Sequence, residues 1–306
     1  MKIIFMGTPD FASSILTSLA SSFDVCAVFT QPDKPQGRKM VLTPPPVKNK
    51  ALELGIPVYQ PETLKNEAIL PLLNEYAPDA IVVAAYGKIL PSYILDYPHY
   101  GCINVHASLL PMYRGAAPIQ RSIIDGCNKT GVTTMLMEKG LDTGDMLEKA
   151  EVVIEDSDNF ETVHDKLAKE GAALIISTLN GIFEAKITPV KQDDSLATYA
   201  AKIENADCEI DFSKNARCIF NQIRGLSPIP LAQCTHGEKK LKIISARTAN
   251  GSGTPGEIIN ISKDSITVAC QEGAIEILVV KPEGKKVMSV KDCLNGRMFS
   301  LGEILK

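Results

Sequence analysis

Three polar residues of different chemistry, Asn104, His106 and Asp142, stand close together in the chain. An amide can donate hydrogen bonds to a developing oxyanion, an imidazole can move a proton, and a carboxylate can orient the imidazole. Asn104 and His106 are two residues apart in a predicted strand, so both should project from the same face. Alone, His106 would more often be a structural histidine, and Asp142 could merely shape a turn. Together the three favour acyl transfer.

The segments around these residues have the composition of ligand-binding loops. They are Ser108-Leu-Leu-Pro111, Arg114-Gly-Ala-Ala-Pro118 and Gly140-Leu-Asp-Thr-Gly-Asp145. The stretch from Ser108 to Gly115 is irregular and offers apolar and backbone surfaces that could hold a flat heterocycle. After the first predicted strand the chain reads Gly7-Thr-Pro-Asp-Phe11, without the glycines of a dinucleotide-binding turn. This disfavours a nicotinamide or flavin cofactor, and no phosphate-binding P-loop is visible.

Short apolar runs alternate with helical patterns through the first half of the chain. Strands are predicted at 2–6, 25–29, 80–84, 102–106 and 130–138, and helices at 11–20, 47–54, 64–76 and 160–183. The run at 80–84 is apolar throughout, which is typical of a parallel strand buried on both faces. The alternation predicts an α/β fold with a doubly wound, mostly parallel sheet.

The pattern changes beyond a polar stretch at 188–206. Further strands are predicted at 229–234, 241–246, 256–261, 265–269 and 274–280, with turn residues between them. Short strands at this density predict a small C-terminal β-barrel of the oligonucleotide-binding (OB-like) type. We therefore expect a catalytic domain at 1–188, a linker at 189–206 and a barrel at 207–306.

Composition limits the class of protein. The chain has 306 residues, 45% hydrophobic and 22% charged, with a net charge of −4, so no global basic field indicates nucleic acid. The eight cysteines are scattered without a C-x-x-C pair, which predicts buried, reduced thiols and no structural metal. No apolar run is long enough for a secretory signal or a membrane span. A cytoplasmic protein is expected, and nothing demands a dimer, so a monomer is expected as well.

Positive charge is concentrated in two places. From Asp207 onward there are 14 basic and 11 acidic residues, a net of +3, against −7 for the rest of the chain. A proline-rich loop from Gln31 to Lys50 carries Lys34, Arg38 and Lys39 among its basic residues. A basic loop that follows a strand is suited to contact a phosphate backbone, although a solvated surface loop is an equally simple interpretation.

The motifs together resemble those of the folate-dependent formyltransferases. The segments that carry the resemblance are Met6-Gly-Thr-Pro-Asp-Phe-Ala12, Asn104-Val-His-Ala-Ser-Leu-Leu-Pro111, Arg114-Gly-Ala-Ala-Pro-Ile-Gln120 and Gly140-Leu-Asp-Thr-Gly-Asp145. The basic loop and the second domain are similar to those of the tRNA-dependent branch, the methionyl-tRNA formyltransferase family, nearly end to end. Glycinamide ribonucleotide formyltransferases share the core but are shorter, one-domain proteins.

The resemblance implies substrates and site residues. It implies 10-formyltetrahydrofolate as the formyl donor and the α-amine of methionine on initiator tRNA as the acceptor. It assigns catalysis to Asn104, His106 and Asp142, and contact with the acceptor end of the tRNA to Arg38. The folate would lie against Ser108, Leu109, Leu110 and Pro111, with Tyr86 and Gly87 near the pterin.

Two stretches depart from the family pattern. Where the family linker has Lys-Glu-Glu, this chain continues from Lys202-Ile203 into Glu204-Asn-Ala-Asp207. The family's Gly-Leu-x-Pro-Trp-Pro is replaced by Gly225-Leu-Ser-Pro-Ile-Pro230, and the chain has no tryptophan. Other activities stay open on sequence alone: a sugar-nucleotide N-formyltransferase, a formyltetrahydrofolate hydrolase, or an RNA-binding protein without catalysis.

Overall fold

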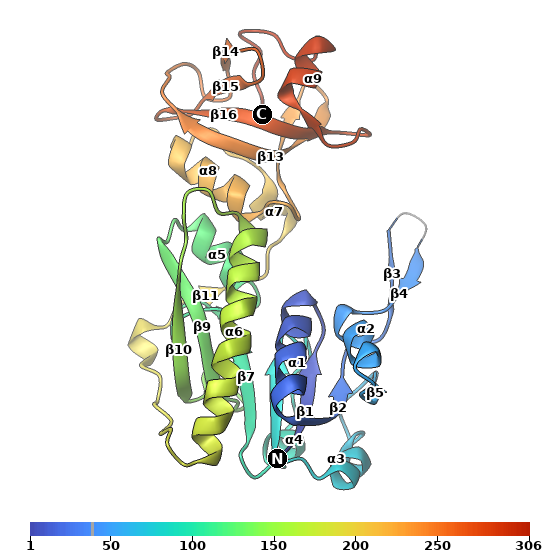
Figure 1. The fold of residues 1–306 in the computed structure, drawn as a ribbon. Helices are drawn as coiled ribbons and strands as arrows, with labels where there is room; N and C mark the ends of the chain where they lie inside the picture. Colours follow the sequence, from blue (N-terminus) through green and yellow to red (C-terminus); the bar gives the residue numbers. More distant parts are fainter. Residues whose placement is uncertain (38–39) are drawn as a thin grey trace. The chain divides into compact units, whose positions relative to one another are not determined.

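The computed structural model describes residues 1–37 and 40–306 and divides into two compact units (Figure 1). The first unit comprises Met1–Gly115, Lys129–Val153 and His164–Tyr199, and the second comprises Ala116–Asn128, Ile154–Val163 and Ala200–Lys306. Two short segments from earlier in the chain therefore fold with the C-terminal part. The two-residue strands β8 (Arg114–Gly115) and β11 (Tyr199–Ala200) lie where the chain passes from one unit to the other.

A seven-stranded sheet forms the centre of the first unit. From one edge to the other its strands are β10 (Met146–Val153), β9 (Lys129–Leu136), β7 (Cys102–His106), β6 (Ala80–Ala84), β1 (Lys2–Gly7), β2 (Asp24–Phe29) and β5 (Val58–Tyr59). The strands from β7 to β5 pair in parallel, and β9 pairs antiparallel with β7 and with β10. All five residues of β6 are buried. The predicted α/β fold with a mostly parallel sheet is confirmed.

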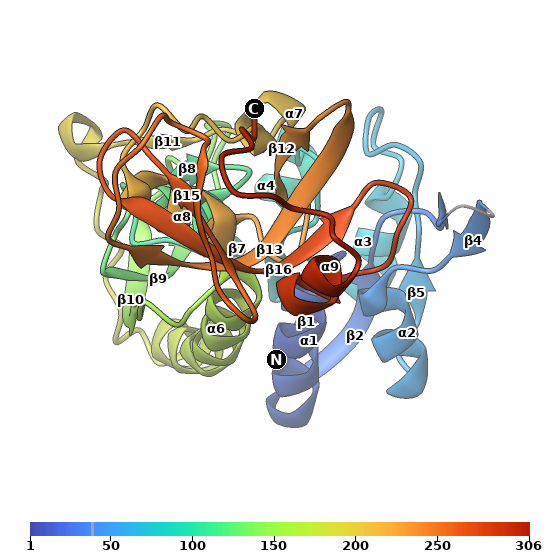
Figure 2. The same cartoon turned by 90° about the horizontal axis from the view of Figure 1, so that it is seen from above.

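Helices cover both faces of this sheet (Figure 2). They are α1 (Asp10–Ser22), α2 (Pro46–Glu53), α3 (Leu70–Tyr76), α4 (Ser92–Leu95) and α6 (Phe160–Phe183), with a 3-10 turn η1 (Asp194–Leu196). On one face, Gly171 of α6 lies against Val105 of β7 and Val132 of β9. On the other, Leu73 of α3 and Ile94 of α4 belong to one buried cluster with Ile81 of β6. Burial of apolar side chains on both faces accounts for the continuous apolar strands.

Two predictions in this unit were wrong. The helix expected at 64–76 begins only at Leu70, because Asn66 and Glu67 adopt positive φ angles of 54° and 55°, which interrupt a right-handed helix. The proline-rich loop, for which no strand was predicted, contains the hairpin strands β3 (Lys34–Gln36) and β4 (Val41–Thr43). A two-stranded ribbon has free edges, so Pro35 is tolerated in it. The antiparallel strand β10 was not predicted.

The second unit is built on an antiparallel sheet. Its strands run in the order β12 (Ala232–His236), β13 (Lys239–Ala249), β16 (Ala274–Pro282), β15 (Ile266–Ala269) and β14 (Ile258–Ile261), and β17 (Met288–Ser289) pairs with β16. The first strand was predicted to begin at 229, but it begins at Ala232, because Pro228 and Pro230 have no N–H group for a ladder. The helices are α5 (Pro118–Ile124), α7 (Asn205–Cys208), α8 (Ala216–Gly225) and α9 (Val290–Asn295).

The C-terminal residues connect the two edges of this sheet. Leu305 bridges to His236 in β12, and Ile304 bridges to Glu257, next to β14. The N–H of Leu305 donates to the carbonyl of Gly256 at 2.8 Å. These bridges pair part of each edge, in the manner in which the expected OB-like barrel would close.

All eight cysteines are free thiols, and five of them are buried. Burial raises the pKa of Cys102 and Cys234 to about 12, which keeps these thiols protonated at neutral pH. Cys218 differs from the sequence expectation because it is exposed, on α8. Within the described residues, no helix has both the length and the hydrophobicity to cross a bilayer.

Candidate active site

Strand β7 brings two of the expected catalytic residues to one face of the sheet. Side chains alternate along a strand, and Val105 points toward α6. Cys102 points the opposite way, with its Sγ 3.4 Å from the carbonyl oxygen of Ile94 in α4. Asn104 and His106 have the same parity as Cys102 and therefore share its face. The predicted projection of the two side chains from one face is confirmed.

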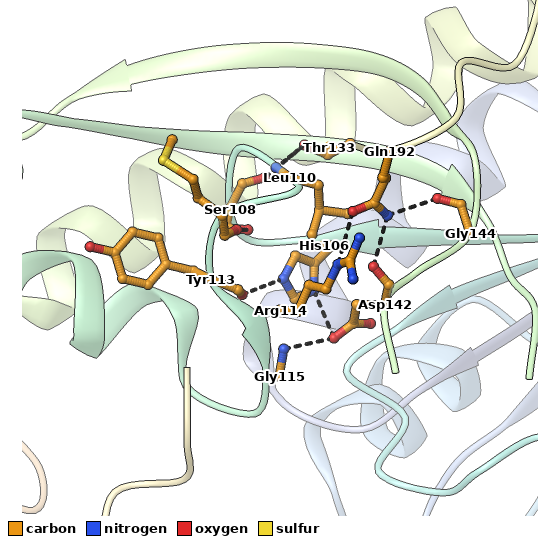
Figure 3. A network of polar contacts seen from close by, with 11 residues as sticks. His106, Ser108, Leu110, Tyr113, Arg114, Gly115, Thr133, Asp142, Gly144 and Gln192 are labelled. Carbon is orange, nitrogen blue, oxygen red and sulfur yellow. Dashed lines mark hydrogen bonds and ion pairs between the residues drawn. The ribbon is translucent and has the colours of Figure 1, made fainter. Parts of the chain in front are cut away.

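The two ring nitrogens of His106 face two hydrogen-bond acceptors (Figure 3). Nε2 is 3.0 Å from the backbone oxygen of Tyr113, and Nδ1 is 3.8 Å from Oδ2 of Asp142. The side chains of His106 and Asp142 are only 7% and 15% exposed. A carbonyl oxygen can only accept, so Nε2 must carry a proton. At 3.8 Å the contact of Nδ1 with Asp142 is too long for a hydrogen bond, and it is an ion pair when the ring is doubly protonated.

Asn104 lies at the centre of the sheet, between Val83 of β6 and Met135 of β9. It is 9% exposed, and no hydrogen bond within the described ranges uses its side-chain amide. An amide in this position has both donors and its acceptor available to a bound substrate.

Asp142 lies in the turn that connects β9 to β10. Its φ angle is 53°, in the left-handed region, which is tolerated better by Asp and Asn than by most residues. Its Oδ2 accepts a hydrogen bond from the N–H of Gly115 at 2.8 Å (Figure 3). The same oxygen faces His106, so the carboxylate links the loop after β7 to the β9–β10 turn.

Two buried residues behind Asp142 had no role assigned from the sequence. Gln192 is 5% exposed, and its Nε2 donates to the backbone oxygens of Asp142 and Gly144, each at 2.8 Å. Arg114 is 2% exposed and donates from Nε to Oε1 of Gln192 at 3.0 Å. Gln192 lies in the polar stretch that was interpreted as a linker, and polar composition alone gives no signal that such a glutamine is buried.

The segment after His106, expected to contact the folate, is fixed to strand β9 by hydrogen bonds. Thr133 of β9 donates from Oγ1 to the carbonyl of Ser108 at 2.7 Å and accepts from the N–H of Leu110 at 3.1 Å. The side chains of Ser108 and Leu110 are buried, whereas Leu109 and Pro111 are partly exposed. A ligand at this segment would therefore meet backbone groups and the two partly exposed side chains, and the buried pair supports the loop.

Tyr86 and Gly87 follow β6, as expected, but the tyrosine ring does not project from the surface. Tyr86 is 2% exposed and belongs to the apolar cluster under α3 and α4. Burial raises the pKa of Tyr86 above its ordinary value, and its hydroxyl has no hydrogen-bond partner among the described residues. Its carbonyl accepts from Oγ1 of Thr8 and Nε2 of Gln31, at 2.9 and 3.1 Å. Gly87, with a φ of 80°, is exposed.

Of the residues expected to contact tRNA, Lys34 is the first residue of β3. Lys34 is exposed, and Arg38 and Lys39 lie outside the described residues. At the base of the hairpin, Nζ of Lys48 binds both carboxylate oxygens of Asp33, at 2.9 and 2.8 Å. Lys48 and a hydrogen bond from Gln60 lower the pKa of Asp33. Lys50, at the end of the loop, pairs with Glu53 at 2.7 Å, so two of the positive charges of this loop are paired.

The atypical acidic stretch at 204–207 forms an ion pair within its own unit. Arg121 of α5 forms a bidentate pair with Asp207, at 2.9 and 2.8 Å, and donates to the carbonyls of Ala201 and Lys202. The Arg121 guanidinium lowers the pKa of Asp207.

In the described part of the chain, no group of three His, Cys, Asp or Glu residues could hold a metal ion.

Comparisons with known proteins agree with this fold. The formyl transferase family matches residues 1–179, and the formyl transferase C-terminal domain family matches residues 202–298. The chain is 48% identical over 305 residues to methionyl-tRNA formyltransferase of Bacillus licheniformis, covering 98% of this chain and 96% of the relative. It is 49% identical over 310 residues to the enzyme of the same name from Caldanaerobacter subterraneus subsp. tengcongensis, covering 100% of both chains.

A solved structure shows a similar fold. It is WlaRD, a sugar 3N-formyl transferase, with a TM-score of 0.68 and 18% identity, over 94% of this chain and 99% of that one. At this identity the likeness supports the fold alone. On the family matches and the full-length identity to its relatives, the chain belongs to the methionyl-tRNA formyltransferase family.

Proposed function

We propose that the chain transfers the formyl group of 10-formyltetrahydrofolate to the α-amine of methionine on initiator methionyl-tRNA, in support of translation initiation. Relatives that bear this activity in their name share almost half of their residues with this chain over nearly its full length. The observation that carries the proposal is the geometry at β7: an unengaged amide and an imidazole on one face, with a carboxylate 3.8 Å from the ring. The enzyme would act in the cytoplasm as a monomer.

The acceptor amine must be neutral to attack. The reference pKa of an α-amino group is about 7.7–8.0, so a useful fraction is neutral near physiological pH. Attack of the nitrogen on the formyl carbon forms a C–N bond and places negative charge on the formyl oxygen. The Asn104 amide donates to this oxyanion, and one well-placed donor contributes roughly 3–4 kcal/mol. Protonated His106 stabilises it through its positive charge, since its two ring nitrogens face Tyr113 and Asp142.

The second half of the reaction breaks the bond between the formyl carbon and N10 of the folate. The attacking nitrogen loses a proton, and N10 gains one as it leaves, so the products are formylmethionyl-tRNA and tetrahydrofolate. Asp142 holds the His106 ring in its protonated form, or positions a water that relays the proton. The reaction needs neither a covalent enzyme intermediate nor a metal ion.

Each substrate has a suitable surface within the first unit. The folate lies against the segment from Ser108 to Pro111, where backbone groups and partly exposed apolar side chains suit a flat ring. Tyr86 supports this side of the site from within the core, and Gly87 leaves room at its edge. Lys34, Arg38 and Lys39 contact phosphates at the acceptor end of the tRNA.

A sugar-nucleotide N-formyltransferase is the second candidate, because WlaRD, a sugar 3N-formyl transferase, shares this fold, and fold alone does not identify the acceptor. That likeness comes with 18% identity, against 48% for a tRNA-dependent relative, so the tRNA acceptor is preferred. A formyltetrahydrofolate hydrolase would use water in place of an amine.

Labelled formyl transfer distinguishes these activities. The purified protein is incubated with 10-formyltetrahydrofolate labelled in the formyl group. The acceptors are methionine-charged initiator tRNA, the same tRNA without methionine, and an amino-sugar nucleotide. We expect label only on the charged tRNA. Label on the sugar nucleotide, or free labelled formate without transfer, would overturn the proposal.

A further inference from the structure

We propose that Gln192 is a positioning residue for Asp142 and that Arg114 holds the Gln192 amide in its active orientation. The inference rests on the proposed function, because it concerns the same site. It is argued from a continuous series of hydrogen bonds, from Arg114 to Gln192 and from Gln192 to the backbone of Asp142 (Figure 3).

Gln192 holds the turn at two points. Its amide nitrogen donates one hydrogen to the carbonyl of Asp142 and the other to the carbonyl of Gly144, each at 2.8 Å. A side-chain amide has two such hydrogens, so both are used. Because the two acceptors lie on either side of Thr143, the amide fixes the direction of the backbone that carries the Asp142 carboxylate.

The turn needs this support because its backbone conformation is unfavourable. Asp142 has a φ of 53°, a region that residues with a side chain rarely occupy and that persists only where surroundings enforce it. Gly144 packs closely against the end of β9, since a Cβ at this position would overlap the carbonyl oxygen of Leu136. Without Gln192, the turn could relax toward ordinary φ values and move the carboxylate away from His106.

Arg114 determines which way the Gln192 amide points. The Nε–H of Arg114 can only donate, so the atom of Gln192 that faces it must be the oxygen. The amide nitrogen is then directed at the two turn carbonyls. Arg114 is 2% exposed and is itself fixed by Oδ1 of Asp194 at 2.7 Å. A buried guanidinium is held in one orientation by such contacts, so the amide cannot rotate.

An isolated bridge at Val190 ties the segment that carries Gln192 to the sheet. The N–H and carbonyl of Val190 exchange hydrogen bonds with those of Met146 at the start of β10, each at 2.8 Å. The segment that carries Gln192 is therefore fixed to the strand that follows the Asp142 turn. The polar stretch after α6 thus helps to hold the Asp142 turn in position.

The test replaces Gln192 by methionine, which has a similar length and no hydrogen-bonding amide. We expect Gln192→Met to lower the single-turnover rate about 10-fold to 100-fold, the range found when residues that orient catalytic groups are removed. The KM values for donor and charged tRNA should change less than about 3-fold, because the residue touches neither substrate.

A double-mutant cycle with Asp142→Asn tests whether Gln192 acts through Asp142. If it does, adding Gln192→Met to Asp142→Asn should lower the rate by less than about 3-fold. The same 10-fold to 100-fold loss in both backgrounds, or a single variant within about 3-fold of wild type, would overturn the inference. Gln233→Met is the matched control. Gln233 is also buried, at 7% exposure, and donates to Oε1 of Glu209 in the second unit at 2.6 Å.

A measurement without turnover separates this inference from the proposed function. The NMR chemical shifts of the His106 ring report how closely the Asp142 carboxylate approaches it. In Gln192→Met they should be displaced toward those of Asp142→Asn, whereas Gln233→Met should keep the wild-type shifts. If these displacements are seen but the wild-type enzyme does not formylate charged tRNA, the proposed function alone is refuted. His106 signals in Gln192→Met identical to wild type would refute the positioning role.

Discussion

Replacement of Asp142 by asparagine removes one charge from the site with little change in shape. The asparagine oxygen can still accept the hydrogen bond that Gly115 donates to Asp142 at 2.8 Å, so the turn should keep its fold. What is lost is the attraction between the carboxylate and a protonated His106 ring. The variant therefore tests whether the charge of Asp142 contributes to catalysis.

The distance between the two groups sets the size of the effect. Two unit charges separated by 3.8 Å attract each other by about 4 kcal/mol at an effective dielectric constant of about 20, and by about 1 kcal/mol in bulk water. The side chains are 7% and 15% exposed, so the higher value is the better guide. Each 1.4 kcal/mol corresponds to roughly a tenfold change in rate, which predicts a loss of about 100-fold to 1000-fold in kcat.

The assay is single-turnover transfer of labelled formyl to charged tRNA at saturating donor. Glu138→Gln is a matched control, because Glu138 is an exposed acid of the same turn whose Oε1 accepts from Thr143. We expect this control to stay within about 2-fold of wild type, as is usual for exposed surface changes. An Asp142→Asn enzyme within about 5-fold of wild type would show that the ion pair is not part of catalysis.

Three further predictions concern the hairpin and the acidic stretch at 204–207. Lys34→Ala should raise the KM for charged tRNA and reduce the slope of log binding constant against log salt by about one, since one phosphate contact is lost; an unchanged slope would mean that Lys34 does not touch phosphate. Asp33→Asn should raise the KM for tRNA several-fold and leave kcat unchanged, because loss of the ion pair with Lys48 leaves the hairpin less well positioned. An unchanged KM for tRNA would mean that this ion pair does not position the hairpin. The pKa of Asp207 is lowered by Arg121, so the pair stabilises the fold above the ordinary carboxyl pKa of 3.8 and this contribution is lost as pH falls through the lower folded value. Asp207→Asn should therefore lower the melting temperature near neutral pH, but not at a pH below the lowered pKa of Asp207, where the carboxyl is protonated. An equal drop in melting temperature at every pH would contradict this dependence on the charge of Asp207.

Much of the fold could be predicted from local sequence. The strands at 80–84 and 102–106 and the helix at 160–183 were located from apolar runs and helical periodicity, since each buries its apolar residues in the core. The helix expected at 64–76 was too long, because nothing in its periodicity reveals the positive φ angles at Asn66 and Glu67. Such conformations depend on tertiary contacts.

The candidate site was only partly predictable. The common face of Asn104 and His106 follows from the two-residue period of a strand, and the nearness of Asp142 was expected from motif resemblance. Gln192 could not be found, because a buried glutamine in a polar segment has the same sequence appearance as an exposed one. Its burial depends on a partner, Arg114, that is distant in the chain.

The central claim is that Asn104, His106 and Asp142 act on one formyl group in transit between two nitrogens. The most direct test is single-turnover transfer of labelled formyl to methionine-charged initiator tRNA by His106→Ala, together with the dissociation constant of the folate donor. We predict that transfer falls by at least about 100-fold while donor affinity stays within a few-fold of wild type, since general acid–base and oxyanion contributions are lost together. Transfer near the wild-type rate would contradict the account.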